Sequence, residues 1–381
     1  MRTLATFLLF VPFTVLSDSI QETIDSFYNE QLVPGVSVAW AQYGHHIETR
    51  VSGMADIERN ITIKADSRML SASIGKTFIS AALLKAFCEN DISLDTPVSQ
   101  WLGHLKWFSQ LPNGAMITLR NILNHTSGLA DHVHLPEFRQ RFTELSKTGS
   151  SMNTEELVAF VLNKEPVFSP GEGWSYSDTG YLLAGLILEM EFNKPWTETI
   201  QDFFIFPQKL HMTEPSNKRF LSGLAVGYTS SANSFGLPDR TMDLSGYLVW
   251  NPAIEGAGGG WVTTPTDLVR WGRDLWSGRL LSKSCMKEML MGVRVSEGMD
   301  TLYGLGVNIE ASSRYGKSLH HLGWIPGYVS SLRYFPDIDL TLAIQVNTDV
   351  DMIGPEGSFS NIEKQIIHDL FSDLDIKAVP H

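Results

Sequence analysis

A serine and a lysine three residues apart begin a predicted helix. Ser73 and Lys76 lie in the run SASIGKTF, residues 71–78. Three residues at about 100° each leave the two side chains roughly 60° apart on one helix face, so the hydroxyl and the amine can touch. A serine becomes a good nucleophile when a neighbour takes its proton, and desolvation lowers the pKa of a lysine toward that task. The pair therefore indicates an activated serine, although S-x-x-K alone also fits a helix cap followed by a surface lysine.

The same run contains Gly75-Lys76-Thr77, which invites a phosphate-binding interpretation. A phosphate-binding loop needs another glycine five residues before Gly75, and Leu70 occupies that position. The sequence therefore excludes a phosphate-binding loop here.

Two further segments have residue types suited to the same chemistry. Residues 168–181, FSPGEGWSYSDTGY, form a turn-rich loop that leads into a predicted helix and contains Tyr176. A phenol beside a lysine can relay protons, or it can simply pack the loop. Residues 320–328, HHLGWIPGY, enter a predicted strand, where glycine permits close approach of another backbone or a substrate. Alone, this third segment is an ordinary glycine-rich turn.

Together and in this order, the three motifs resemble the serine β-lactamase and penicillin-binding family. The resemblance is to the branch with class C β-lactamases, D-Ala-D-Ala carboxypeptidases, D-aminopeptidases and related esterases. The family pattern is S-x-x-K, then Y-x-N, then K-T-G or H-x-G; here it reads SIGK at 73–76, YSD at 176–178 and HLG at 321–323. Similar landmarks occur at 94–98, 117–129 and 258–261, and the resemblance runs from about residue 20 to 375.

This resemblance implies an acyl-enzyme mechanism with no metal and no cofactor. Ser73 is the expected nucleophile, Lys76 its proton acceptor and Tyr176 the proton relay to and from the leaving group. The backbone N–H groups of Ser73 and Trp324 would form the oxyanion hole, and His321 would border the substrate on an edge strand. The residues expected to bind substrate are Asp178, His321, Gly323 and Trp324.

Two positions depart from the family pattern. Asp178 stands where an amide is usual, and a carboxylate cannot donate a hydrogen bond to a substrate carbonyl. It should also pair with Lys76, raise the pKa of the lysine and hold it protonated, which shifts the base role toward Tyr176 or slows the reaction. His321 replaces a lysine that would attract a substrate carboxylate, so esters and neutral amides remain candidate substrates beside β-lactams and peptides.

Composition narrows the classes of partner. The 381 residues have a formal net charge of −13 and no long run of Lys or Arg, which argues against nucleic-acid binding. Two cysteines, Cys88 and Cys285, can make at most one disulfide. Because Cys88 falls in step with Ala81 and Leu84 on a helix face, a buried free thiol is favoured, and neither cysteine is assigned a role.

The first residues suggest export. Arg2 precedes an apolar stretch at 4–16 and then Ser17-Asp18-Ser19, which is typical of a secretory signal cleaved after Ser17 or Ser19. A retained membrane anchor is the alternative, but the stretch is shorter than a spanning helix and contains Pro12. We expect a signal peptide at 1–17, a secreted or periplasmic mature protein, and no membrane span within it.

Apolar periodicity places helices and strands along the chain. Helices are expected at 19–31, 73–89, 154–162, 181–191, 265–276 and 360–370, and strands at 36–41, 47–51, 304–309, 328–334 and 340–346. This order indicates an α+β fold in which both chain ends build one sheet. With the resemblance, the expectation is a β-lactamase/transpeptidase-like antiparallel sheet flanked by helices. The sheet subdomain would span about 18–70 and 255–381, and an inserted, mostly helical subdomain about 71–254.

The sequence thus predicts an exported serine hydrolase that acts on a D-amino-acid peptide such as a cell-wall peptide, on a β-lactam or on a small ester. A non-catalytic binding or scaffold relative is the second hypothesis, motivated by Asp178. Metal binding by His125, Asp131, His132 and His134 is disfavoured, because His125 belongs to a turn in this interpretation. A calcium loop starting at 349 is disfavoured too, because Ile353 and Ser360 occupy ligand positions. The oligomeric state and the acyl substrate are left open.

Overall fold

The computed structural model describes residues 18–44, 46–296, 301–353, 357–374 and 376. A nine-stranded antiparallel sheet is its largest element, with strand order β3-β2-β1-β12-β11-β10-β9-β8-β7. A small second sheet has the order β4-β6-β5. The strands are β1 Gly35–Gln42, β2 Glu48–Asp56, β3 Ile61–Thr62, β4 Met69–Leu70, β5 Glu214–Pro215, β6 Trp261–Thr263, β7 Val293–Arg294, β8 Thr301–Tyr303, β9 Asn308–Glu310, β10 Ser318–Ile325, β11 Tyr328–Phe335 and β12 Leu340–Val346.

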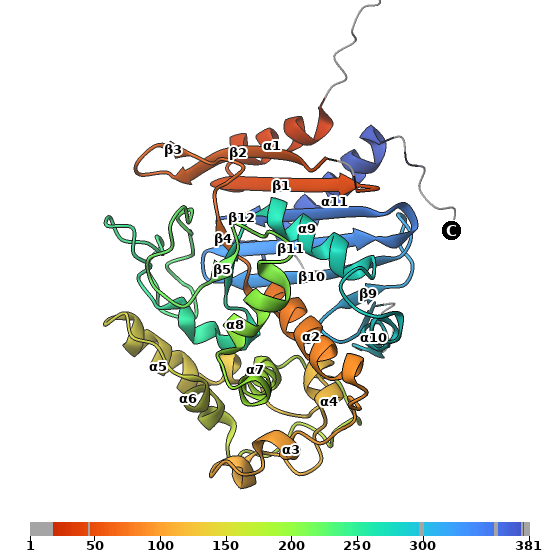
Figure 1. Ribbon diagram of the computed structural model, residues 1–381. Helices are drawn as coiled ribbons and strands as arrows, with labels where there is room; N and C mark the ends of the chain where they lie inside the picture. The colour runs from red at the N-terminus through yellow and green to blue at the C-terminus, as the bar shows by residue number, and fades with distance from the viewer. Residues whose placement is uncertain (1–17, 45, 297–300, 354–356, 375, 377–381) are drawn as a thin grey trace, which may run out of the picture.

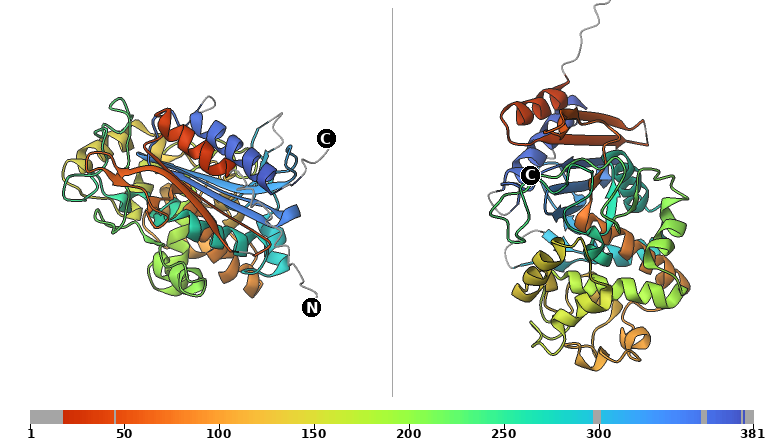
Figure 2. Two further views of the ribbon diagram at one scale, coloured as in Figure 1. Left: turned by 90° about the horizontal axis from the view of Figure 1, so that it is seen from above. Right: turned by 90° about the vertical axis from the view of Figure 1, so that its left-hand side faces the viewer.

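Helices cover both faces of the large sheet. They are α1 Ser19–Asn29, α2 Gly75–Ala86, α3 Ser99–Leu102, α4 Leu119–Leu123, α5 Pro136–Ser146, α6 Thr154–Val158, α7 Asp178–Phe192, α8 Trp196–Ile200, α9 Pro265–Trp276, α10 Lys283–Met289 and α11 Ser358–Asp373. Helices α1 and α11 lie side by side on one face, and α9 with the remaining helices lies on the other (Figures 1 and 2). The α+β expectation is confirmed.

The two chain ends meet in the layer formed by α1 and α11. Ile20 and Ile24 of α1 and Ile362 and Ile366 of α11 are buried against the apolar face of the sheet. The Thr23 hydroxyl also donates to Asp369 at 2.6 Å, which links the two helices. Burial of these apolar side chains therefore joins segments some 340 residues apart.

Helices α2 and α7 form the centre of the helical region (Figure 1). Every residue of α2 except Lys85 is buried, and so is the stretch 179–188 of α7. A helix that is apolar on all sides belongs in a protein interior rather than at its surface. The apolar side predicted for α2 is therefore only part of its buried surface, and both helices are held rigidly by packing on all sides.

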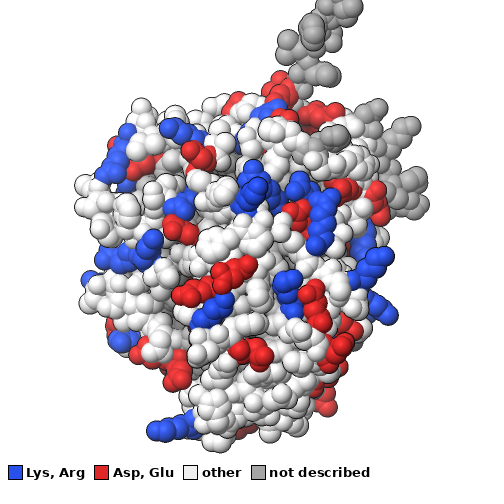
Figure 3. Space-filling model, in the orientation of Figure 1, with Lys and Arg blue, Asp and Glu red and all other residues white. Residues whose placement is uncertain are grey.

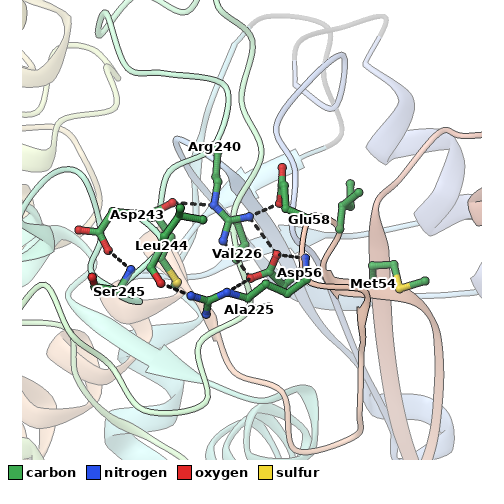
Figure 4. Close-up of polar contacts among 12 residues, drawn as sticks. Met54, Asp56, Glu58, Ala225, Val226, Arg240, Asp243, Leu244 and Ser245 are labelled. Carbon is green, nitrogen blue, oxygen red and sulfur yellow. Dashed lines mark hydrogen bonds and ion pairs between the residues drawn. The ribbon is translucent and has the colours of Figure 1, made fainter.

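A long segment between β5 and β6 runs mostly without helix or strand (Figure 1). Arg240 ties this segment to the hairpin of the large sheet, because its guanidinium donates to both carboxylate oxygens of Asp56 at 2.9 Å and also to Glu58 (Figure 4). Arg59 donates to the backbone carbonyl of Leu244 on the same segment. A bidentate arginine–carboxylate pair fixes orientation as well as distance, so these contacts hold the segment in place.

The cysteines correct one expectation. Cys88 and Cys285 form a disulfide, with Cα atoms 5.8 Å apart, so the predicted free thiol at position 88 is wrong. Cys88 lies just beyond the end of α2 and Cys285 lies in α10. The two residues are 197 positions apart, and only the packing of α10 against α2 brings them together.

Several predicted elements match the structure and two do not. Strand β12 and helix α9 have the predicted limits, and β11 ends one residue beyond its predicted end. The run 304–309 is not one strand, because residues 304–307 form a turn between β8 and β9. The HHLGW motif does not precede a strand but lies within β10. Strand β10 is also not at the edge of the sheet, since β11 and β9 flank it.

Charged side chains of both signs occur on one face of the molecule. On the face shown in Figure 3, acidic and basic side chains are interspersed, without a continuous patch of either sign. Within the described residues, no helix is long and apolar enough to cross a membrane. The predicted signal peptide at 1–17 lies outside the described residues, and the subdomain limits stay a prediction.

Candidate active site

Ser73 lies in a tight turn directly before α2. The turn is the 3₁₀ segment Ala72–Ile74, and Ala72 adopts φ +47°, a conformation that L-residues rarely adopt. Strain of this kind persists only where surrounding structure enforces it, and it is frequent at functional sites. Ser73 is partly exposed, whereas Ala72 and Ile74 are buried. The turn therefore presents the serine hydroxyl toward solvent from a rigid base.

Two glycines allow other backbone segments to approach this turn. A methyl group added at Gly323 of β10 would lie 2.0 Å from the Ser71 carbonyl oxygen and 3.3 Å from the Ser73 nitrogen. One added at Gly75 would lie 1.9 Å from the Gly259 carbonyl oxygen. Strand β10 and the glycine-rich loop 258–260 are therefore packed directly against the nucleophile turn, which no larger residue at 75 or 323 would permit.

Lys76 is fully buried in the first turn of α2. Its ammonium donates to the Ser73 Oγ at 3.0 Å, to the Gly258 carbonyl at 2.6 Å and to the Asp178 carboxylate. These three bonds use all three donors of the ammonium. Burial alone would lower the pKa of Lys76, but the adjacent Asp178 carboxylate and Tyr176 outweigh burial and raise the pKa above its ordinary value. Lys76 is therefore a cation in the resting protein.

Tyr176 lies in the loop before α7, with its ring 4.9 Å from the Lys76 ammonium. Burial raises the pKa of its phenol to about 12, although hydrogen bonding to Lys76 and Ser73 acts in the opposite direction. The ring packs on His125, with centroids 4.2 Å apart, and His125 Nδ1 accepts from the Ser177 N–H. Burial lowers the pKa of His125 well below its usual value, so His125 is a neutral support for the tyrosine loop.

Asp178 is the first residue of α7 and is about 21% exposed. The carboxylate pairs with Lys76, as the sequence predicted. A carboxylate in the first turn of a helix is also stabilised by the helix dipole. The expected convergence of Ser73, Lys76, Tyr176 and Asp178 is thus present in the structure, while the roles assigned to them stay predictions.

His321 is only 2% exposed, and both of its ring nitrogens are already engaged. Nε2 lies 2.9 Å from the Tyr303 hydroxyl and Nδ1 lies 2.7 Å from the Leu322 carbonyl. Burial lowers its pKa to about 3, so the ring is neutral. His321 lines the cavity without a free polar atom, and the prediction that it lies on an edge strand is wrong. Among the described residues, β9 pairs with residues 318–320 of β10 alone, so no described strand covers this side of Gly323 and Trp324.

A cavity of about 480 Å³ opens in front of Ser73. One wall is aromatic: Phe142 packs against Phe235 and Trp250, with ring centroids 5.0 and 5.6 Å apart, and Phe235 lies 6.0 Å from Trp324. Trp324 is fixed by its indole N–H, which donates to Asp349 at 3.1 Å. The long segment held by Arg240 supplies Phe235 and Trp250. The sequence analysis missed this wall, since nothing in the local pattern marks these aromatics as neighbours.

Of the carboxyl groups of this cavity, the sequence analysis placed only Asp178 in the site; it considered Asp131 solely as a disfavoured metal ligand and did not identify the other two. Four carboxyl side chains line the cavity, whereas no Lys or Arg does so among the described residues; the carboxyl groups belong to Asp131, Asp178, Glu255 and Glu363. An acid within the glycine-rich run at 254–260 was the available signal for Glu255. In the described part of the chain, no group of three or more His, Cys, Asp or Glu side chains is placed to hold a metal ion.

Comparison with known proteins agrees with this fold. The Beta-lactamase family model matches residues 20–357, so the chain belongs to the beta-lactamase family. Penicillin-binding protein 4* of Bacillus subtilis is 26% identical over 308 residues, which cover 78% of this chain and 65% of that protein. The chain thus spans somewhat less than two thirds of that relative.

Two solved structures cover nearly the whole described chain. A D-stereospecific amidohydrolase from a Streptomyces species has a TM-score of 0.77 and 28% identity, covering 92% of this chain and 97% of that one. The D-amino acid amidase of Ochrobactrum anthropi SV3 has a TM-score of 0.77 and 25% identity, covering 93% and 98%. The recognised family and the β-lactamase-type fold are thereby confirmed.

Proposed function

We propose that this chain is an exported serine hydrolase that forms an acyl-enzyme at Ser73 with an amide or ester of a D-amino acid. The observation that carries the proposal is the convergence of Ser73, Lys76 and Tyr176 at one end of a 480 Å³ cavity. The structural similarity to two enzymes described as a D-stereospecific amidohydrolase and a D-amino acid amidase supports the substrate class.

The contacts suggest how the serine loses its proton. Lys76 donates to the Ser73 oxygen, so the serine O–H is free to point toward Tyr176. Because Lys76 is charged in the resting protein, it accepts that proton only after it has lost one of its own. Neutral Lys76 is therefore the proton acceptor, with the neutral phenol of Tyr176 as relay, and the Asp178 carboxylate raises the pKa that sets how much of the lysine is neutral.

The oxyanion hole is proposed at the junction of the turn and β10. Gly323 lies against residues 71–73, which brings the backbone of Trp324 near that of Ser73. Two N–H donors there would stabilise the tetrahedral intermediate, each contributing roughly 10²- to 10³-fold in rate. Water then hydrolyses the acyl-enzyme within the same cavity.

Export is supported by the disulfide as well as by the leader sequence. Disulfides persist in oxidising compartments and are rare in the cytosol. The pairing of Cys88 with Cys285 therefore supports a secreted or periplasmic location.

Active-site labelling tests the proposal. A fluorophosphonate or fluorescent penicillin should label the wild-type protein and not Ser73→Ala; equal labelling of both would reject it. Parallel assays with a nitrophenyl ester, a chromogenic cephalosporin, a D-Ala-D-Ala peptide and D-phenylalanine amide would separate esterase, β-lactamase, carboxypeptidase and amidase activities.

A non-catalytic binding relative is the second candidate, favoured by the ion pair that keeps Lys76 protonated. Such a protein would bind a ligand in the cavity, but incubation with an activated ester would not increase its mass by an acyl group.

A further inference from the structure

Glu255 lies beside the nucleophile turn but belongs to a different segment. It is part of the 3₁₀ segment Pro252–Gly258, and its Oε2 accepts the Gly260 N–H at 3.2 Å. A methyl group added at Gly259 would lie 2.0 Å from this oxygen and 3.1 Å from the carbonyl carbon of Ala72. The carboxyl group is therefore packed close to the peptide that leads into Ser73.

The second oxygen of Glu255 has no hydrogen-bond partner among the described residues. Oε1 is buried and accepts no hydrogen bond from any described residue. The other three carboxyl groups of the cavity are engaged: Asp178 with Lys76, Glu363 with Arg333, and Asp131 with the Val133 N–H. A buried oxygen without a donor is costly, so a ligand that brings a donor to it gains that energy.

The rest of the cavity wall indicates which donor fits. No described Lys or Arg lines the cavity, so a substrate carboxylate finds no positive side chain on the wall. The Glu255 carboxyl group and the faces of the aromatic wall both favour a cation.

We infer that Glu255 binds a protonated primary amine on the carbon next to the scissile carbonyl, so that the substrate is an amino-acid amide or ester, or a peptide, with a free amino group. This inference rests on the proposed function, because it places that amine relative to an acyl group on Ser73. An amine at that carbon lies close to the carbonyl that Ser73 attacks, and Glu255 borders the Ser73 turn.

The charge state of Glu255 gives the inference a distinct signature. Burial raises the pKa of Glu255 to about 8; the Gly260 N–H lowers it, the Asp178 carboxylate raises it, and the Lys76 ammonium lowers it. The empty site thus holds a neutral acid at pH 6. An ammonium group at Oε1 favours the ionised form, so binding should release close to one proton. Asp131, whose pKa burial raises to about 7, is the other cavity acid able to contribute.

Calorimetry on a variant that cannot acylate tests this directly. D-phenylalanine amide should bind Ser73→Ala at pH 6. When the binding enthalpy is measured in buffers of different ionisation enthalpy, its dependence on the buffer should correspond to the release of nearly one proton. Adding Glu255→Gln keeps an acceptor for the Gly260 N–H but removes the charge. It should weaken binding about 10- to 100-fold and abolish the proton release.

Two controls isolate the amine. Glu172→Gln, an exposed residue on the tyrosine loop, removes the same charge and should leave both quantities unchanged. N-acetyl-D-phenylalanine amide should bind no differently to the Ser73→Ala proteins with and without Glu255→Gln.

Absence of binding, or binding and proton release that survive Glu255→Gln, overturns the inference. Labelling of Ser73 by a fluorophosphonate is scored separately, so failure of the amine site is distinguishable from failure of the proposed hydrolase activity.

Discussion

Two buried cations on opposite faces of the sheet make similar contacts for different purposes. On the α11 face, Arg333 donates to Glu363 through Nε and Nη2, to Glu310 at 2.7 Å and to the Ser318 hydroxyl at 2.7 Å. These bonds use four of the five N–H donors of Arg333. On the other face, Lys76 uses all three of its donors. The partners of Arg333 belong to the sheet and α11, and Glu363 among them also lines the cavity, whereas one Lys76 partner is the partly exposed Ser73 hydroxyl. The comparison shows that a buried cation stabilises the fold through its partners, and becomes chemically useful only when one of those partners is a potential nucleophile.

The largest effect should come from removing the cation beside the serine. Lys76→Met should lower kcat/KM by at least about 10³-fold, because the proton acceptor of Ser73 is lost. Lys76→Arg keeps the charge but cannot lose its proton, and should be similarly inactive. Steady-state assays with circular dichroism as a check of folding would measure this. Substantial activity in Lys76→Arg would contradict a proton-transfer role.

Arg333→Met should instead affect stability. Leaving Glu363 buried without its cation should cost about 3–5 kcal/mol in the free energy of unfolding. The folded fraction should keep its specific activity, because Arg333 lies across the sheet from Ser73. Urea unfolding monitored by tryptophan fluorescence would measure the loss. Arg333→Met combined with Glu363→Leu should recover much of it, and no recovery would show that the cluster is not an isolated unit.

The disulfide should have a smaller effect on stability. Replacing Cys88 and Cys285 with serine removes a constraint on a long loop of the unfolded chain and should cost about 2–4 kcal/mol. The loss would be measured from the melting temperature of the double variant, compared with that of the wild type with and without a reductant. Equal stability of the oxidised wild type and the double variant would argue against a disulfide in the folded protein.

Asp178→Asn should produce the most subtle change, a displaced pH profile. The Asp178 carboxylate raises the pKa of Lys76, so its removal should lower that pKa. Activity that requires an unprotonated lysine increases as pH rises through this pKa. The rising limb of kcat/KM should therefore move to lower pH. An unchanged profile would indicate that the Lys76–Asp178 pair does not control the proton transfer.

Local patterns predicted much of the fold because they reflect local physics. The limits of α9 coincide with Thr264, whose side chain accepts from the Asp267 N–H, and with Pro265 at the first helical position. Strand β12, with the sequence LTLAIQV, is apolar at five of its seven positions and buried throughout. By contrast, the end of β10 was predicted as a turn, because Gly323 and Pro326 mark turns in sequence. In the structure Gly323 is required for close packing against Ser71.

The residues of the candidate site also divide into those that local sequence predicted and those that it did not. Spacing alone placed Lys76 one turn from Ser73, and the ordered motifs brought Tyr176 and Asp178 into the hypothesis. Glu255 and the aromatic wall were not predicted, because their neighbours lie far away in sequence.

The sequence by itself determined the nucleophile motif, the helices and strands with strong periodicity, and the family, because these depend on residues that are close together in the chain. Only the tertiary structure decided that Cys88 meets Cys285, that Lys76 uses every donor, and that one oxygen of Glu255 beside the Ser73 turn accepts no hydrogen bond from the described part of the chain. Those outcomes depend on how distant segments pack and exclude water, which determines both the partners of each polar group and the free energy of its charged form.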